Sequence, residues 1–231
     1  MTEGRNSKPW LSYGRPDENG PCVEFLAINL PAPGILGRRL TDNVSLEDLE
    51  EYIDWTFFFS AWELKGKFPK IFESKKYGEA ARELFDNGQT LLRRIIDEKW
   101  LTPRGVYGFW PAASQGDDIV LFADASRERG RVRFPMLRQQ SAIPDGKPNR
   151  SLADFVAPLE SGLHDHIGAF AVTSGTETEA LARDFEQAHD DYNAIMTKAL
   201  ADRLAEAFGE LLHQRARRDW KYGIDENFDP S

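Results

Sequence analysis

Asp54 is the first candidate for chemistry in this sequence, because it is an acid in unusual surroundings. It lies in a segment dense in aromatic residues that runs from Tyr52 to Phe72. An ionised carboxylate among aromatic rings is costly unless it is paired or faces a cleft. The residues leave two interpretations open: Asp54 faces a binding cleft, or it caps a helix that begins at Trp55.

A second group of candidates lies on one face of a predicted long helix. At about 100° per residue, small, apolar and acidic residues and one histidine gather on that face: Ile195, Ala199, Asp202, Glu206, Gly209 and His213. A solvated face is usually richer in Lys and Glu, so this mixture suggests a second contact surface. A solvated face with chance alanines is the alternative.

The helix that carries this face is predicted from Thr176 to about Trp220, a stretch without proline. Its apolar residues recur every three or four positions: Leu181, Phe185, Ala188, Tyr192, Met196, Leu200, Leu204, Phe208 and Leu211. We expect Thr176 to cap the first turn. A break near Asp190 and Asp191 would divide the stretch into two helices.

Other common kinds of catalytic or metal site find little support. His164-Asp165-His166 could bind a metal, but a polar turn before a strand is the favoured interpretation. Neither the glycine-rich nucleotide-binding motifs nor the serine-hydrolase motif occurs. The single Cys22 excludes an intramolecular disulfide and a cysteine-based zinc site.

Composition narrows the class of protein further. The 231 residues carry a net charge of −9, which argues against a nucleic-acid binder because phosphate contacts need Lys and Arg. No apolar run is long enough to span a membrane, and the polar N-terminus predicts no signal peptide. These features together indicate a cytoplasmic protein. Residues 1–34, rich in Pro, Gly, Asn and charge, are predicted to form a flexible arm.

The rest of the chain predicts interleaved helices and strands. Ser45 opens a capping-box sequence, and the spacing of apolar residues predicts a helix over Tyr77 to Lys99. Four segments rich in Val, Ile, Phe and Tyr predict strands, and the first three lie close enough for an antiparallel meander: Gly105 to Trp110, Asp118 to Ala123, Arg131 to Met136 and Ile167 to Thr173. Residues 151–155 predict a short helix or turn. Because no linker interrupts the series, we expect one α+β domain over residues 35–231.

Several motifs in a fixed order suggest a known family. They are Tyr52-Ile53-Asp54-Trp55-Thr56, Trp62-Glu63-Leu64-Lys65-Gly66-Lys67, Gly116-Asp117-Asp118-Ile119, Leu137-Arg138-Gln139-Gln140, Leu152-Ala153-Asp154-Phe155, His189-Asp190-Asp191-Tyr192-Asn193 and Leu204-Ala205-Glu206-Ala207-Phe208. From about residue 35 to Tyr222 the chain resembles the reactivation domain of cobalamin-dependent methionine synthase. The resemblance implies a C-shaped α+β domain with a twisted antiparallel sheet flanked by long helices.

The resemblance also implies a function. Such a domain binds S-adenosylmethionine and presents its methyl group for reductive methylation of cob(II)alamin. Cobalamin is held by another module or chain of the synthase, and a flavodoxin-like donor supplies the electron. The chain would then be part of a methyltransferase rather than a complete enzyme, with no nucleic-acid or membrane partner.

The family's ligand contacts correspond to two acids of this sequence. The Asp of Tyr-Ile-Asp-Trp-Thr matches Asp54, and the Glu of Leu-Ala-Glu-Ala-Phe matches Glu206. We therefore expect both carboxylates to line one S-adenosylmethionine cleft. Position 57 is Phe, where the family usually has Pro. No metal ligand and no catalytic residue is predicted.

The C-terminus differs from the family pattern. The family continues into an Arg-Pro-Ala-Pro-Gly-Tyr segment beyond the point where this sequence stops at Ser231. On this basis the chain is expected to be C-terminally short and to bind S-adenosylmethionine weakly on its own. Met1 and the polar arm favour a separate polypeptide, and a fragment is the alternative. A non-catalytic interaction or scaffold protein that has lost S-adenosylmethionine binding is the alternative function.

Overall fold

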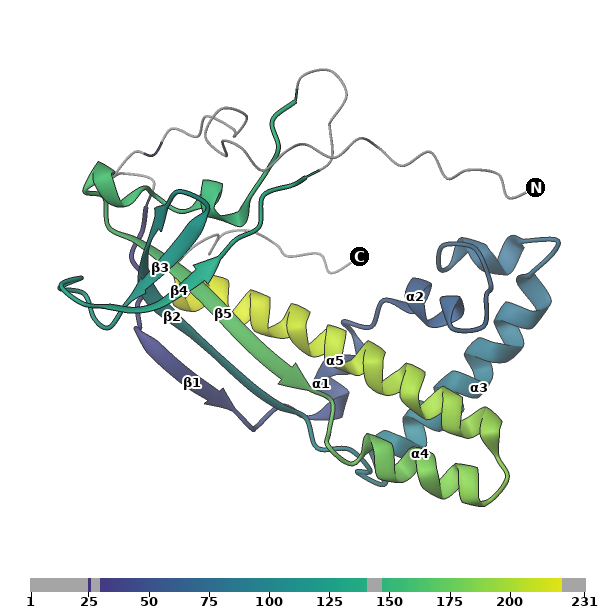
Figure 1. The fold of residues 1–231 in the computed structure, drawn as a ribbon. Coiled ribbons are helices and arrows are strands. Elements are labelled where there is room, and N and C mark those ends of the chain that lie inside the picture. The colour runs from purple at the N-terminus through teal and green to yellow at the C-terminus, as the bar shows by residue number, and fades with distance from the viewer. Residues whose placement is uncertain (1–24, 26–29, 141–146, 222–231) are drawn as a thin grey trace. The chain divides into compact units, whose positions relative to one another are not determined.

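The computed structural model describes residue 25, residues 30–140 and residues 147–221. The predicted arm over residues 1–34 lies mostly outside the described residues. The helices are α1 Leu46–Glu50, α2 Trp55–Ser60, η3 Lys70–Glu73, α3 Gly78–Asp97, η5 Leu152–Phe155, η6 Leu159–Ser161, α4 Thr178–Gln187 and α5 Asp191–Asp219. The strands are β1 Gly37–Thr41, β2 Arg104–Gln115, β3 Asp118–Phe122, β4 Gly130–Pro135 and β5 Asp165–Thr173 (Figure 1).

The chain groups into two compact units. The helical unit comprises Arg38–Tyr107 and Phe170–Arg218, and the strand unit is built around Gly108–Ala169. The long strands β2 and β5 contribute residues to both units. The expectation of one domain over residues 35–231 stays a prediction.

Helix α5 supplies the largest part of the helical unit's core. The side chains of Met196, Leu200, Leu204 and Phe208 are fully buried, as the three- and four-residue spacing of the apolar residues predicts. Helix α4 lies beside α5, where Lys198 pairs with Glu186 at 3.1 Å (Figure 1). The predicted break is confirmed, because α4 ends at Gln187 and α5 begins at Asp191.

Backbone and capping geometry explain how the break forms. His189 adopts a positive φ of 57°, which ends α4. The Asp190 carboxylate then accepts a hydrogen bond from the backbone N–H of Asn193 at 3.0 Å and so caps the start of α5. The expected cap at Thr176 is wrong. The N-cap of α4 is Glu177 without a side-chain hydrogen bond, and the nearby hydroxyl of Thr178 donates to the Gly175 carbonyl instead.

The aromatic segment folds into a cluster between α2, η3 and α3. The rings of Phe58, Phe59, Phe68, Phe72 and Phe85 contact one another, mostly edge to face, at centroid separations of 5.5 to 6.5 Å. Such contacts bury large areas and add a small directional preference. The cluster fixes α2, and therefore fixes the position of its N-cap residue.

Gly88 allows α2 and α5 to pack closely against α3. A methyl group at this position would lie 2.7 Å from Cζ of Phe58 and 3.6 Å from Sδ of Met196. Asparagine and glycine are both poor helix formers, yet α3 is continuous over its 20 residues through Asn87 and Gly88. Close packing against Phe58 and Met196 therefore explains why glycine occupies position 88.

The strand unit contains the predicted antiparallel meander. Strand β2 pairs with β3, and β3 pairs with β4, with Ala112 opposite Leu121 and Ile119 opposite Phe134. The strand order is β1-β2-β3-β4, and β5 also pairs with β2. Strand β1 was not predicted, because its residues are mostly exposed and its Gly-Arg-Arg-Leu-Thr sequence lacks a strand pattern. The predicted short helix after Ser151 is η5, which begins with a capping box.

A buried ion network ties the loops of the strand unit together. The Arg138 guanidinium donates to Asp117 at 2.7 Å and to both carboxylate oxygens of Asp154 at 2.5 and 2.8 Å. All three side chains are about one-tenth exposed. Burial raises the pKa of Asp154, but the Arg138 hydrogen bonds and the Ser151 N–H outweigh it and hold that pKa below its usual value.

Gly88→Ala should destabilise the protein by on the order of 1 kcal/mol or more, because overpacking outweighs the gain in helix propensity. Gly209→Ala in α5 is the matched control, since its new methyl group would lie 3.5 Å from Phe170, an ordinary contact. We expect Gly209→Ala to be neutral or stabilising. Urea unfolding of both variants checks this, and equal effects of the two substitutions would contradict the packing explanation.

Arg138→Leu should destabilise the protein at pH 7 by about 3–5 kcal/mol, because it leaves two buried carboxylates without their partner. Since the folded pKa of Asp154 is lowered, its contribution is present above the unfolded value of about 3.9 and is lost as pH falls through the folded pKa. The difference between the parent and the variant should therefore shrink below about pH 4.

The control for this experiment is Arg133→Leu. Arg133 pairs with Asp118 at 2.7 Å, but its side chain is about half exposed. Such a pair contributes about 0–1 kcal/mol. A chemical-denaturation series from pH 3 to 8 separates the two cases, and a pH-independent effect of Arg138→Leu would show that the ion network is not its cause.

Candidate ligand-binding site

A pocket of about 450 Å³ opens in the helical unit between strand β5 and helix α5. It is lined by Phe170, Val172, Asp202, Ala205, Glu206, Gly209, Glu210 and His213. Its volume falls within the range of about 300–1,000 Å³ that is usual for small-molecule sites. One wall is therefore apolar and comes from β5, and the other is rich in carboxylates and comes from α5.

The helical repeat explains why these α5 residues share one wall. Positions 202, 205, 206, 209 and 213 recur at three- and four-residue spacing, on the side away from the buried Leu204 and Phe208. The ring of Phe170 lies beside Gly209, where an added methyl group would be 3.5 Å from the ring. Four of the six residues that the sequence grouped into a second contact surface line this pocket, and they are Asp202, Glu206, Gly209 and His213.

Arg203 organises the charges of the acidic wall. Its Nη1 and Nη2 donate to the two oxygens of Glu206 at 2.6 and 2.8 Å, and Nη2 also donates to Asp202 at 2.6 Å. The Arg203 side chain is only 8% exposed, whereas Asp202 and Glu206 are more than half exposed. Burial lowers the pKa of Arg203, but the two carboxylates outweigh burial and raise it, so the guanidinium stays charged.

The two predicted site residues, Asp54 and Glu206, do not both line this pocket. Glu206 lines the pocket, and Asp54 is not among the residues that line it. Asp54 instead caps α2, where its Oδ1 accepts from the backbone N–H of Thr56 at 2.8 Å. An ionised carboxylate has about four acceptor positions, so a capping bond leaves capacity for a ligand. A cleft shared by Asp54 and Glu206 stays a prediction.

Phe57, one turn after Asp54 on α2, contacts the arginine that is paired with Glu206. The Arg203 guanidinium lies over the Phe57 ring, 5.5 Å from its centroid. The helix that Asp54 caps is thus packed against the arginine that holds Glu206. Arg203, Phe57, Phe170 and Val172 were not among the predicted site residues. Arg203 could have been noticed as a charged residue beside Leu200 and Leu204 on the apolar side of the helix.

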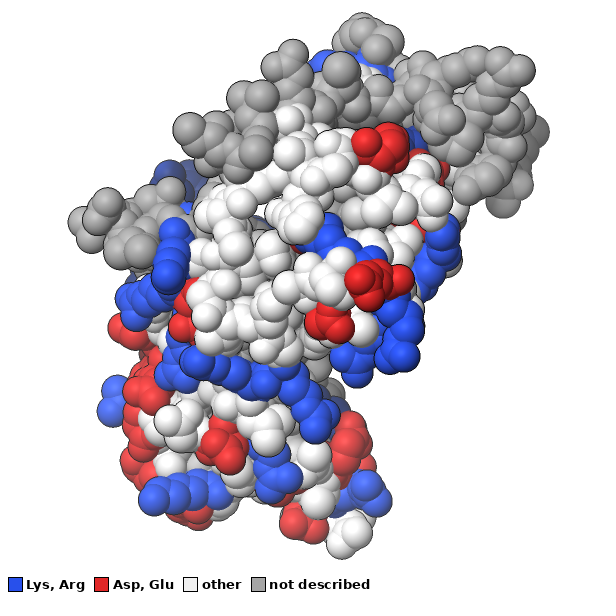
Figure 2. Space-filling model, turned by 90° about the vertical axis from the view of Figure 1, so that its left-hand side faces the viewer, with Lys and Arg blue, Asp and Glu red and all other residues white. Residues whose placement is uncertain are grey.

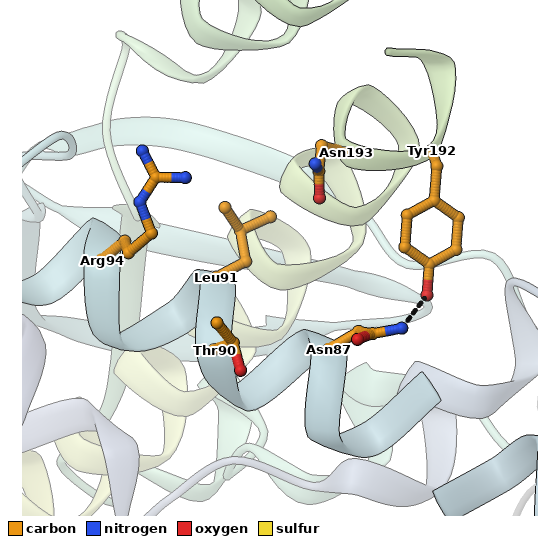
Figure 3. A pocket seen from close by; sticks show the side chains of 6 residues that line it. All are labelled: Asn87, Thr90, Leu91, Arg94, Tyr192 and Asn193. Atoms are coloured by element: carbon orange, nitrogen blue, oxygen red, sulfur yellow. Dashed lines mark hydrogen bonds between the residues drawn. The ribbon is translucent and has the colours of Figure 1, made fainter. Parts of the chain in front are cut away.

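A second, smaller hollow of about 260 Å³ lies between α3 and the start of α5 (Figure 3). Its lining residues are Asn87, Thr90, Leu91, Arg94, Tyr192 and Asn193. Asn87 donates to the Tyr192 hydroxyl, and Asn193 donates to Asp190. Because these amide groups already bond to neighbours, the hollow is a weaker candidate than the β5–α5 pocket.

Neither a cluster of metal ligands nor a membrane-spanning helix is found in the described part of the chain. Within it, no group of three or more His, Cys, Asp and Glu residues is arranged to hold a metal ion. Asp165 of the His-Asp-His sequence instead accepts from the backbone N–H groups of Ala157 and His166 at the start of β5. None of the described helices is long and apolar enough to span a bilayer. Acidic and basic side chains are interspersed over the face shown in Figure 2, with an uncharged area between them.

The structure has an α+β fold with an antiparallel sheet and long helices, and comparisons with known proteins place the chain in a family. Residues 45–231 match the family described as "Vitamin B12 dependent methionine synthase, activation domain". The chain therefore belongs to this family, which confirms the resemblance seen in its sequence motifs.

A solved structure supports the same assignment. The chain is similar to the protein in "Crystal Structure of the MetH Reactivation Domain bound to AdoHcy", with 45% sequence identity and a TM-score of 0.88. The match covers 96% of this chain and 68% of that chain. The α+β fold class expected from the sequence is confirmed by this likeness.

Asp54→Ala should destabilise the protein by about 1 kcal/mol, because α2 loses its N-cap. Asp54→Asn should stay within about 0.5 kcal/mol of the parent, because asparagine is an equally good N-cap residue. Thermal unfolding of the two variants tests the capping role. Equal loss in both would mean that the negative charge of Asp54, rather than the cap, matters for stability.

Proposed function

We propose that this chain binds S-adenosylmethionine in the β5–α5 pocket and acts as the reactivation module of a cobalamin-dependent methionine synthase. The observation that carries the proposal is that a residue matched to a ligand contact of the family lines a pocket of this structure. Glu206, matched to the family by its motif, lines the pocket. The similar protein of known structure is a reactivation domain bound to the demethylated form of the same ligand.

The chemistry of the pocket fits such a ligand. S-adenosylmethionine combines a flat adenine ring, ribose hydroxyls, an amino group and a positively charged sulfonium. Phe170 is 52% exposed and, with Val172, offers an apolar surface against which a ring can pack. The carboxylates of Asp202, Glu206 and Glu210 can accept hydrogen bonds from hydroxyl and amino groups, and the acidic wall as a whole complements a cation.

The role of the module follows from the family. The family is a domain of cobalamin-dependent methionine synthase, so the partner is a cobalamin-binding module. Bound S-adenosylmethionine would supply the methyl group that returns an oxidised cobalamin to its methylated form. The residues of this chain would bind and orient that donor. We propose that the accompanying electron comes from a flavodoxin-like protein and that the system works in the cytoplasm, as the single cysteine of the sequence suggests.

Isothermal titration of the 231-residue chain with S-adenosylmethionine tests the proposal. We expect saturable one-to-one binding, weakened by roughly 5- to 100-fold in Glu206→Gln, because one polar contact is worth about 1–3 kcal/mol. Asp54→Asn should weaken binding as well while leaving the fold intact.

Glu186→Gln is the matched control for Glu206→Gln. Glu186 also pairs with a basic side chain, Lys198, and is about half exposed, but it lies on α4 outside the pocket. Its affinity for the ligand should equal that of the parent. A folded parent chain that shows no binding would contradict the proposal and favour the alternative, an interaction protein of the same fold that has lost the ligand.

A further inference from the structure

Arg203 occupies an unusual position for a charged residue. It lies on the buried side of α5, beside Leu200, Leu204 and Ala207, and only 7% of the residue is exposed. A long, flexible side chain that is held in such surroundings has lost most of its freedom. Burial therefore restricts the positions that its guanidinium can adopt.

The fixed guanidinium in turn fixes a carboxylate of the pocket. Both oxygens of Glu206 accept from Arg203, at 2.6 and 2.8 Å, in a two-pronged arrangement that defines the plane and direction of the carboxylate. Glu206 is otherwise more than half exposed, and without this partner its side chain would sample several rotamers. Asp202 accepts from the same guanidinium at 2.6 Å.

Phe57 restrains Arg203 from the neighbouring helix α2. Its ring centroid lies 5.5 Å from the centre of the guanidinium, within the range of a cation–π contact. Because 58% of Phe57 is exposed, packing in the hydrophobic core does not explain where its ring lies. The contact joins α2 to the acidic wall of the pocket.

We propose that Arg203 is a positioning residue for the ligand site, that it sets the direction of the Glu206 carboxylate, and that Phe57 holds Arg203 in place. The inference rests on the proposed binding of S-adenosylmethionine. It also specifies which ligand groups Glu206 recognises. Because the Arg203 guanidinium offsets much of the negative charge of Glu206, this carboxylate accepts hydrogen bonds from hydroxyl or amino groups rather than acting as the counter-ion of the sulfonium.

A double-mutant cycle on ligand affinity tests this role. Arg203→Met should weaken S-adenosylmethionine binding by about 10-fold in the parent chain, the size expected for one polar contact. In the Glu206→Gln background the same substitution should weaken binding by less than about twofold, since the group that it positions is already gone. Equal losses in the two backgrounds would overturn the proposal, because a general structural role predicts them.

Two further measurements sharpen the test. Phe57→Leu is an exposed substitution that should fold normally; it should weaken binding severalfold when Arg203 is present and leave binding unchanged when Arg203 is Met. The affinity ratio of S-adenosylmethionine to S-adenosylhomocysteine should be the same in the parent and in Glu206→Gln, because both ligands carry the same hydroxyl and amino groups and Arg203 offsets the charge that this substitution removes. A ratio that changes several-fold would show that Glu206 senses the sulfonium charge.

Arg82→Met is the matched control. Arg82 also lies over an aromatic ring, that of Phe72, at 5.1 Å, and it donates to the Phe72 carbonyl, but it lines neither the β5–α5 pocket nor the second hollow. The affinity of this variant for S-adenosylmethionine should equal that of the parent. If the parent chain itself fails to bind, the proposed function fails and this inference with it; if the parent binds and the cycle is additive, only the inference fails.

Discussion

Helix α5 buries one side in the core and presents the other to the β5–α5 pocket, and the helical unit depends on this division. Met196, Leu200, Leu204 and Phe208 are fully buried. The opposite positions that line the pocket are mostly acidic or small, with Gly209 next to Phe170 of β5. Opposite sides of the same helix therefore contribute to the core and to the pocket wall. A substitution that shifts α5 will change both.

In the strand unit, a buried ion network has the corresponding role. Arg138, Asp117 and Asp154 come from three separate sequence motifs, and the structure brings their side chains to hydrogen-bonding distance. Asp154 also belongs to the capping box that begins η5. Each of the three motifs is thus explained by a shared contact, although their spacing in the sequence gives no hint of it. Such a network favours one arrangement of the loops, because a partly satisfied network of buried charges is costly.

The elements that depend on local rules could be predicted from the sequence. The capping box at Ser45, the apolar spacing of α3 and α5, the break before Asp191 and the antiparallel meander all follow from short-range patterns. Strand β1 could not be predicted, because its exposed residues carry no alternation. The cap at Thr176 was wrong, since the Thr178 hydroxyl bonds to the Gly175 carbonyl and α4 begins without a side-chain cap.

In the candidate site, too, the contacts between residues close in sequence could be predicted and the others could not. Its α5 wall was predicted from helical spacing, including Glu206 and Asp202, because those residues are close in sequence. The β5 wall and the Phe57–Arg203 contact join segments that are more than 25 residues apart, and no spacing rule identifies such neighbours. Asp54 shows a different difficulty. Its residue type fits both a helix cap and a ligand contact, and the structure establishes the cap.

The central claim is that the ligand binds between β5 and α5, and backbone amide NMR of the full chain titrated with S-adenosylmethionine tests it most directly. The claim predicts that the largest chemical-shift changes fall on residues 170–172 and 202–213, with small changes at the hollow lined by Asn87, Arg94 and Tyr192. Changes centred on that second hollow, or none near Glu206 while the ligand binds, would contradict the account.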